Sequence, residues 1–180
     1  MTVDHDNKGR RVKGKWAAGI PPRNFTWIVK DQLALSERPG GFAPHHRRVR
    51  RQEEIIWLRV QEFNRVISLL PSPHNLQAYE DGGLAWAHYA LSSGVDPRPI
   101  LEDCYRDVRD SLAAGLKVLM HRDELGDQLM GVVAGFLVWS GRLTSGPQAV
   151  ATVEHMIGRQ MGPGGRELVA AVVVPPSRTG

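Results

Sequence analysis

Two kinds of hydrophobic pattern alternate along this chain. Short continuous apolar runs at 65–70 and 117–121 are typical of strands covered on both faces, whereas residues 48–63 and 128–140 carry apolar positions at helical spacing. Weaker patterns predict strands at 25–29, 33–36 and 84–91 and helices at 74–81, 100–114, 147–158 and 164–173. This alternation predicts an α/β domain with a central, mostly parallel sheet of about four to five strands flanked by helices.

The length of 180 residues suits one domain. We expect a flexible, basic N-terminal extension over 1–22, a folded domain over 23–174 and a tail over 175–180. No apolar run approaches the roughly 20 residues that span a bilayer, so no membrane association is expected. The single cysteine, Cys104, excludes an internal disulfide and favours the cytoplasm. Nothing in the sequence calls for a cofactor or a metal.

The net charge of +4 is unevenly distributed. One basic group lies between residues 8 and 15, and a second lies at the start of the predicted helix 48–63. The candidate partner-binding residues of the second group are Arg47, Arg48, Arg50 and Arg51. Such groups attract nucleic acid or an acidic protein surface, and they also occur as plain solvated charge.

The carboxyl end of the 117–121 strand is where an α/β sheet would bind a ligand. Five segments, in this order, resemble the dual-specificity and tyrosine phosphatase superfamily, particularly its small bacterial members: 24–27, 33–40, 66–70, 118–121 and 162–166. The resemblance implies the cysteine-phosphatase fold. In that family the sequence His-Cys-x-x-Gly-x-x-Arg follows the central strand, and its cysteine, its arginine and a separate aspartate carry the chemistry.

Set against that pattern, the loop has lost its reactive groups. The degenerate phosphate-loop positions are His121, Arg122, Asp123, Glu124, Leu125, Gly126, Asp127 and Gln128. Only the histidine is kept, with Arg122 at the nucleophile position and Gln128 at the arginine position. Ser93 stands where the general acid is expected, with Asp96 three residues further on, and Cys104 falls inside a predicted helix. The resemblance therefore implies no catalytic residue, and we expect a pseudophosphatase rather than an enzyme.

Asp123, Glu124 and Asp127 bring three carboxylates to this loop. Like charges about 5 Å apart repel by about 3 kcal/mol at an effective dielectric constant of about 20, which disfavours phosphate. Carboxylates near a helix start also simply complement the helix dipole. We expect a reshaped loop with Arg122 paired to one of these acids. A loop filled by Arg122 would favour a binding role, and an open pocket would favour an enzyme.

Three functional hypotheses follow. The first is an inactive phosphatase-like domain that regulates or binds a protein partner. The second is a hydrolase with non-cysteine chemistry, with or without a metal, in which Asp123, Glu124 or Asp127 acts as a base or a metal ligand. The third is a nucleic-acid-binding accessory protein that uses the two basic groups.

Overall fold

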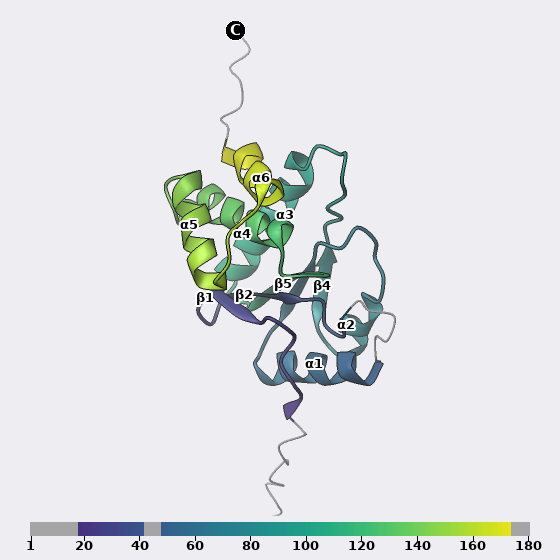
Figure 1. The fold of residues 1–180 in the computed structure, drawn as a ribbon. Helices are drawn as coiled ribbons and strands as arrows, with labels where there is room; N and C mark the ends of the chain where they lie inside the picture. Colours follow the sequence, from purple (N-terminus) through teal and green to yellow (C-terminus); the bar gives the residue numbers. More distant parts are fainter. Residues whose placement is uncertain (1–17, 42–47, 174–180) are drawn as a thin grey trace, which may run out of the picture.

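The computed structural model describes residues 18–41 and 48–173, and within them it contains a five-stranded sheet (Figure 1). The strand order is β1-β2-β5-β3-β4. Only β1 runs antiparallel to its neighbour, and the other three pairings are parallel. The strands are β1 (Thr26–Val29), β2 (Leu33–Glu37), β3 (Arg65–Ser68), β4 (Ala85–His88) and β5 (Val118–Arg122). The predicted mostly parallel sheet is confirmed.

Helices cover both faces of this sheet. One aromatic-rich core lies under α1 and α2, and a larger apolar core lies under the other four helices (Figure 1). The helices are α1 (Arg48–Val60), α2 (Gln77–Asp81), α3 (Arg98–Ala113), α4 (Asp127–Trp139), α5 (Gly146–Ile157) and α6 (Pro163–Val173). The flanked α/β architecture that the sequence predicts is therefore present, with element ends shifted by a few residues.

The central strand β5 is buried between β2 and β3 because its apolar run fits a strand covered on both faces. The register pairs Glu37 with Arg122 and Ser68 with His121. Three parallel strands therefore end at one edge of the sheet, and the chain segments that leave them meet there.

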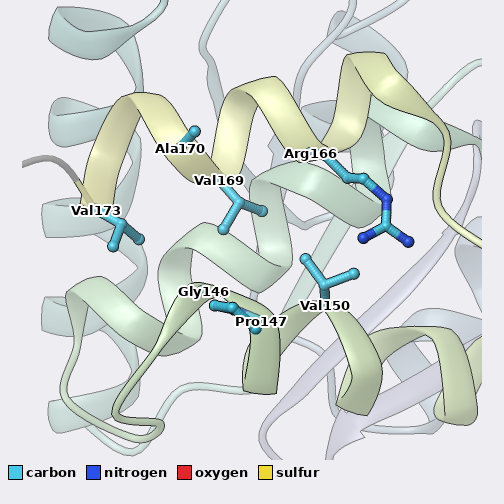
Figure 2. A pocket seen from close by; sticks show the side chains of 7 residues that line it. All are labelled: Gly146, Pro147, Val150, Arg166, Val169, Ala170 and Val173. Atoms are coloured by element: carbon cyan, nitrogen blue, oxygen red, sulfur yellow. The ribbon is translucent and has the colours of Figure 1, made fainter.

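Helix α4 follows β5 and is buried over most of its length. It packs against α6 through Gly131 and Gly165, where a Cβ atom on either glycine would collide with the opposing helix. Side by side, α5 and α6 leave an apolar groove of about 500 Å³ (Figure 2). No sequence-predicted site residue lines this groove. The close packing of α4 against α6 holds α4, and with it the loop at the start of α4, against the sheet.

The predicted N-terminal extension falls mostly outside the described residues, as does the predicted tail. Within the described part, Gly19 packs closely against the backbone of Glu53 and Trp57 on α1, and the Ile20 N–H donates to the Glu53 carbonyl at 3.4 Å. No helix among the described residues is both long and apolar enough to cross a bilayer.

Candidate functional site at the carboxyl edge of the sheet

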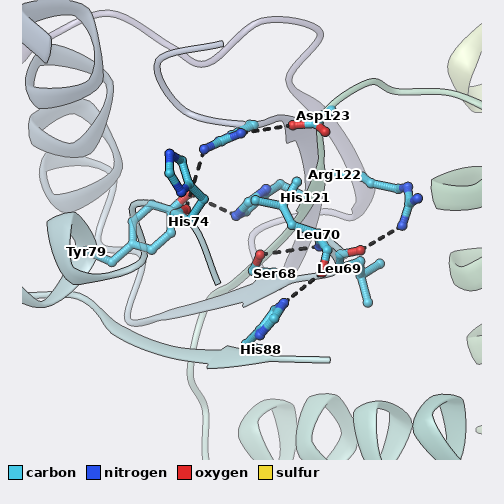
Figure 3. A network of polar contacts seen from close by, with 10 residues as sticks. Ser68, Leu69, Leu70, His74, Tyr79, His88, His121, Arg122 and Asp123 are labelled. Carbon is cyan, nitrogen blue, oxygen red and sulfur yellow. Dashed lines mark hydrogen bonds and ion pairs between the residues drawn. The ribbon is translucent and has the colours of Figure 1, made fainter. Parts of the chain in front are cut away.

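The end of β5 is anchored from the inside by His121 (Figure 3). Its ring is fully buried, and Nε2 shares a hydrogen bond of 2.8 Å with the hydroxyl of buried Tyr79. Nδ1 has no hydrogen-bond partner among the described residues. Burial, together with the nearby Arg38 cation, lowers the pKa of His121 to about 3. The ring is therefore neutral and structural, as a histidine that ends a buried strand commonly is.

Arg122 occupies the position of the family's nucleophile, and its side chain leaves the loop sideways (Figure 3). One guanidinium nitrogen, Nη1, donates to the Leu69 carbonyl at 2.7 Å and to the Leu91 carbonyl at 3.0 Å. Burial lowers the pKa of Arg122, with Asp123 opposing that shift. The prediction that Arg122 pairs with a loop acid is wrong, because the ends of β3 and β4 present carbonyl acceptors within its reach. Arg122, the last residue of β5, thus ties this strand end to the segments that follow β3 and β4.

Two of the three loop carboxylates already have cationic partners. Asp123 pairs with Arg38 at 3.2 Å, and Asp127 pairs with Arg159 at 3.5 Å. Glu124 is exposed and has no ion pair among the described residues. Asp123 and Asp127 are therefore neutralised from outside the loop, which lowers the repulsion that the sequence alone suggests and leaves Glu124 as the unpaired carboxylate within the described part of the chain.

The loop encloses an open pocket of about 380 Å³. Its lining residues are Arg122, Asp123, Glu124, Gly126, Asp127, Gln128 and Leu129. Leu125, at the family's glycine position, is 8% exposed and joins the large core instead. Among residues 18–41 and 48–173, no group of three or more histidine, cysteine or carboxylate side chains is arranged to hold a metal ion. By the criterion set from the sequence, an open pocket favours an enzyme.

The expected general-acid segment lies elsewhere. Ser93 and Asp96 belong to the turn after β4, and neither lines the loop pocket. Asp96 accepts hydrogen bonds from the side chain and backbone of Arg98, and these lower its pKa. A lowered pKa opposes proton donation near neutral pH. Cys104 is buried in α3, where burial raises the pKa of its thiol, so it does not replace the missing nucleophile.

The predicted basic surface at the start of α1 is split by the helix. Arg48 is exposed, whereas Arg50 binds the buried carboxylate of Glu54 at 2.6 Å. Arg51 is half-buried, and the positive charge of Arg38 lies close enough to repel its guanidinium. Arg47 lies outside the described residues. Its role in partner binding stays a prediction.

Comparison with solved structures identifies the fold. The crystal structure of Tk-PTP in its active form is 20% identical with a TM-score of 0.65, and the match covers 83% of this chain and 95% of that one. Kinase-associated phosphatase, crystallised with its catalytic cysteine changed to serine, is 17% identical with a TM-score of 0.69 over 82% of this chain and 92% of that one. This chain has the dual-specificity and tyrosine phosphatase fold. Human DUSP28 matches it at 16% identity and a TM-score of 0.64, covering 85% of this chain and 94% of that one. No protein-family model and no curated protein sequence matches the chain.

The prediction that the chain is not an enzyme is contradicted by these neighbours. They are phosphatases, one of them crystallised in its active form, so the shared fold gives no ground for calling this chain inactive. The inference from sequence went too far for a physical reason. Loss of the cysteine removes one nucleophile, but it does not remove the pocket or the carboxylates that line it.

Several residues that shape the phosphatase-fold site were missed from sequence. These are Arg38, Tyr79 and Arg159, together with the carbonyls of Leu69 and Leu91. Arg38 could have been found, because β2 runs parallel to β5 and residue 38 follows the last residue of β2. The other contacts depend on how distant segments pack and leave no local signal.

Proposed function

We propose that this phosphatase-fold protein is a regulatory or binding protein whose recognition surface is the 122–128 loop, and that it works in the cytoplasm. One observation carries the proposal: Arg122, at the nucleophile position, donates hydrogen bonds to the carbonyls of Leu69 and Leu91. We call this pair of hydrogen bonds the clamp. A side chain bound in this way gives the loop a fixed shape. Recognition sites built on such rigid supports bind with less loss of entropy.

The proposed ligand of the loop is a cationic group, such as a lysine or arginine side chain of a partner protein. Asp123, Glu124 and Asp127 line the pocket, while Nη1 of Arg122 is taken by two carbonyls. Glu124 has no ion pair among the described residues, so its carboxylate is available to an incoming cation. A phosphate would be repelled by the carboxylate of Glu124, which lines the pocket without an ion pair among the described residues, while Arg38 and Arg159 already offset the charges of Asp123 and Asp127.

The test compares two labelled peptides, one rich in lysine and arginine and one carrying phosphotyrosine. We expect the basic peptide to bind and Glu124→Gln to weaken its binding about threefold, since exposed charge pairs contribute up to about 1 kcal/mol. The matched control is Glu167→Gln, an exposed carboxylate on α6, which should leave the affinity unchanged. Binding of the phosphopeptide alone would overturn the proposal.

A second candidate is a hydrolase with non-cysteine chemistry at the same pocket. It is supported by the phosphatase neighbours and by the open, carboxylate-lined pocket. Glu124 or Asp127 would act there as a base toward water. Turnover of para-nitrophenyl phosphate, measured with magnesium or manganese and without metal, should then fall at least about tenfold in Asp127→Asn. Absence of turnover under every metal condition would reject this candidate and leave the binding proposal standing.

A further inference from the structure

The outward face of α1 carries an exposed apolar stripe, separate from the loop pocket. Val49, Ile56 and Val60 are 64%, 45% and 51% exposed. Their spacings of seven and four residues place them on one side of the helix. The opposite side of α1, with Ile55 and Leu58, is buried against the sheet. The side chains of the stripe are therefore not part of the apolar surface that the domain buries when it folds.

Positive charge borders this stripe. Arg48 and Arg59 are exposed on one flank and make no ion pair among the described residues, while Glu53 is the acid on the other flank. The N-terminal segment joins the body beside α1, because Gly19 and Ile20 contact the Glu53 backbone. Among the described residues, the exposed charge beside the stripe is therefore mostly positive.

We propose that the α1 stripe docks an acidic amphipathic helix of a partner protein. An amphipathic helix places apolar anchors at spacings of three, four and seven residues, which match the spacings of Val49, Ile56 and Val60. Its carboxylates would face Arg48 and Arg59. From Val49 to Val60 the stripe extends roughly 16 Å at 1.5 Å per residue, about three turns of a bound helix.

Charge and composition argue against the other occupants. A second copy packed antiparallel would bring Arg48 of one molecule toward Arg59 of the other, and these like charges would repel. A membrane-surface helix carries large anchors such as Trp, Phe or Leu on its apolar face, and here the stripe holds only Val and Ile. Nucleic acid would gain nothing from an exposed apolar stripe, because its affinity comes from phosphate contacts.

The test uses the full chain and a fluorescent helical peptide with leucines at helical spacing and glutamates on its other face. A scrambled peptide of the same composition is the specificity control. We expect Ile56→Ser to weaken binding about tenfold, as loss of a central apolar anchor does. Met156→Ser is the matched control, since Met156 on α5 is 41% exposed, close to Ile56. Arg59→Glu should weaken binding at low salt and less at high salt.

Three further probes decide the class of partner. Vesicles of phosphatidylserine and phosphatidylcholine, a DNA duplex and sedimentation of the chain alone test membrane, nucleic acid and self-association. The proposal would be overturned if the chain preferred the scrambled peptide, or if Ile56→Ser bound the ordered peptide as tightly as the unsubstituted chain. It would also be overturned if vesicles, DNA or a second copy bound in a way that depends on Ile56 while the peptide did not bind. Ile56-dependent binding of the ordered peptide supports it, because an exposed side chain can be changed without unfolding the domain.

Discussion

The two sides of the segment 121–128 are built differently. On the inner side, His121 has a partner in Tyr79, and Asp123, at the border of the pocket, has one in Arg38; both partners come from distant elements. On the outer side, Glu124 and Gln128 line a pocket and have no side-chain partner among the described residues. The inner side holds the strand end in place, and the outer side is free to contact a ligand. Within residues 121–128, the inner side chains therefore support the fold, and the outer side chains carry the changed chemistry.

The largest test of this contrast is pH. The pKa of His121 is lowered from an ordinary 6.5 to about 3, so between these values the unfolded chain binds a proton that the folded ring does not. This contribution to stability is complete above pH 6.5 and is lost as the pH falls, by about 3 kcal/mol at about pH 4.5. Urea unfolding at both pH values should show that His121→Gln loses this extra pH dependence. If the free energy of unfolding changed equally with pH in the two proteins, His121 would not be the structural anchor of β5.

The second test removes the clamp. Arg122→Ala leaves the Leu69 and Leu91 carbonyls without their cationic donor, and we expect a loss of about 2 kcal/mol in the free energy of unfolding. Arg98→Ala serves as control because it breaks a fully exposed pair with Asp96, which contributes little to stability. A loss no larger than that of the control would mean that Arg122 holds nothing in place.

The third test concerns the ion pair between Arg38 and Asp123. Asp123→Asn keeps an acceptor oxygen but removes the charge, and the pair is partly exposed, so the loss should be about 0.5–1 kcal/mol. The midpoint of thermal unfolding should fall by about 1–4 °C. Arg38→Gln should give a similar shift, because the two residues act as one pair. Markedly different shifts would place the contribution of Arg38 in its other contact, the His74 carbonyl.

The smallest effect belongs to the outer side. Glu124→Gln should change the free energy of unfolding by less than about 0.5 kcal/mol, since its carboxylate is exposed and has no ion pair among the described residues. Chemical denaturation measures this directly. A loss as large as that of Arg122→Ala would erase the distinction between the two sides of the loop.

Much of the scaffold was predictable because local patterns fix it. The apolar run before His121 predicted β5, and the helix after Gly126 began where the pattern indicated. The strand around 84–91 was predicted too long, because β4 lies at the sheet edge and only Ala85–His88 pair with β3. The direction of Arg122 was not predictable, since its acceptors lie 53 and 31 residues away in sequence. Electrostatic reasoning limited to neighbours in sequence chose the wrong partner for it.

The two carbonyls held by Arg122 also constrain any attempt to engineer cysteine-phosphatase chemistry into this chain. A thiol placed at position 122 would remove the only donor recorded for those carbonyls within residues 18–41 and 48–173. The segments that carry these carbonyls would then lose their support before the loop could bind an anion. Reconstruction therefore needs replacement supports on the β3 and β4 sides first, and the nucleophile last.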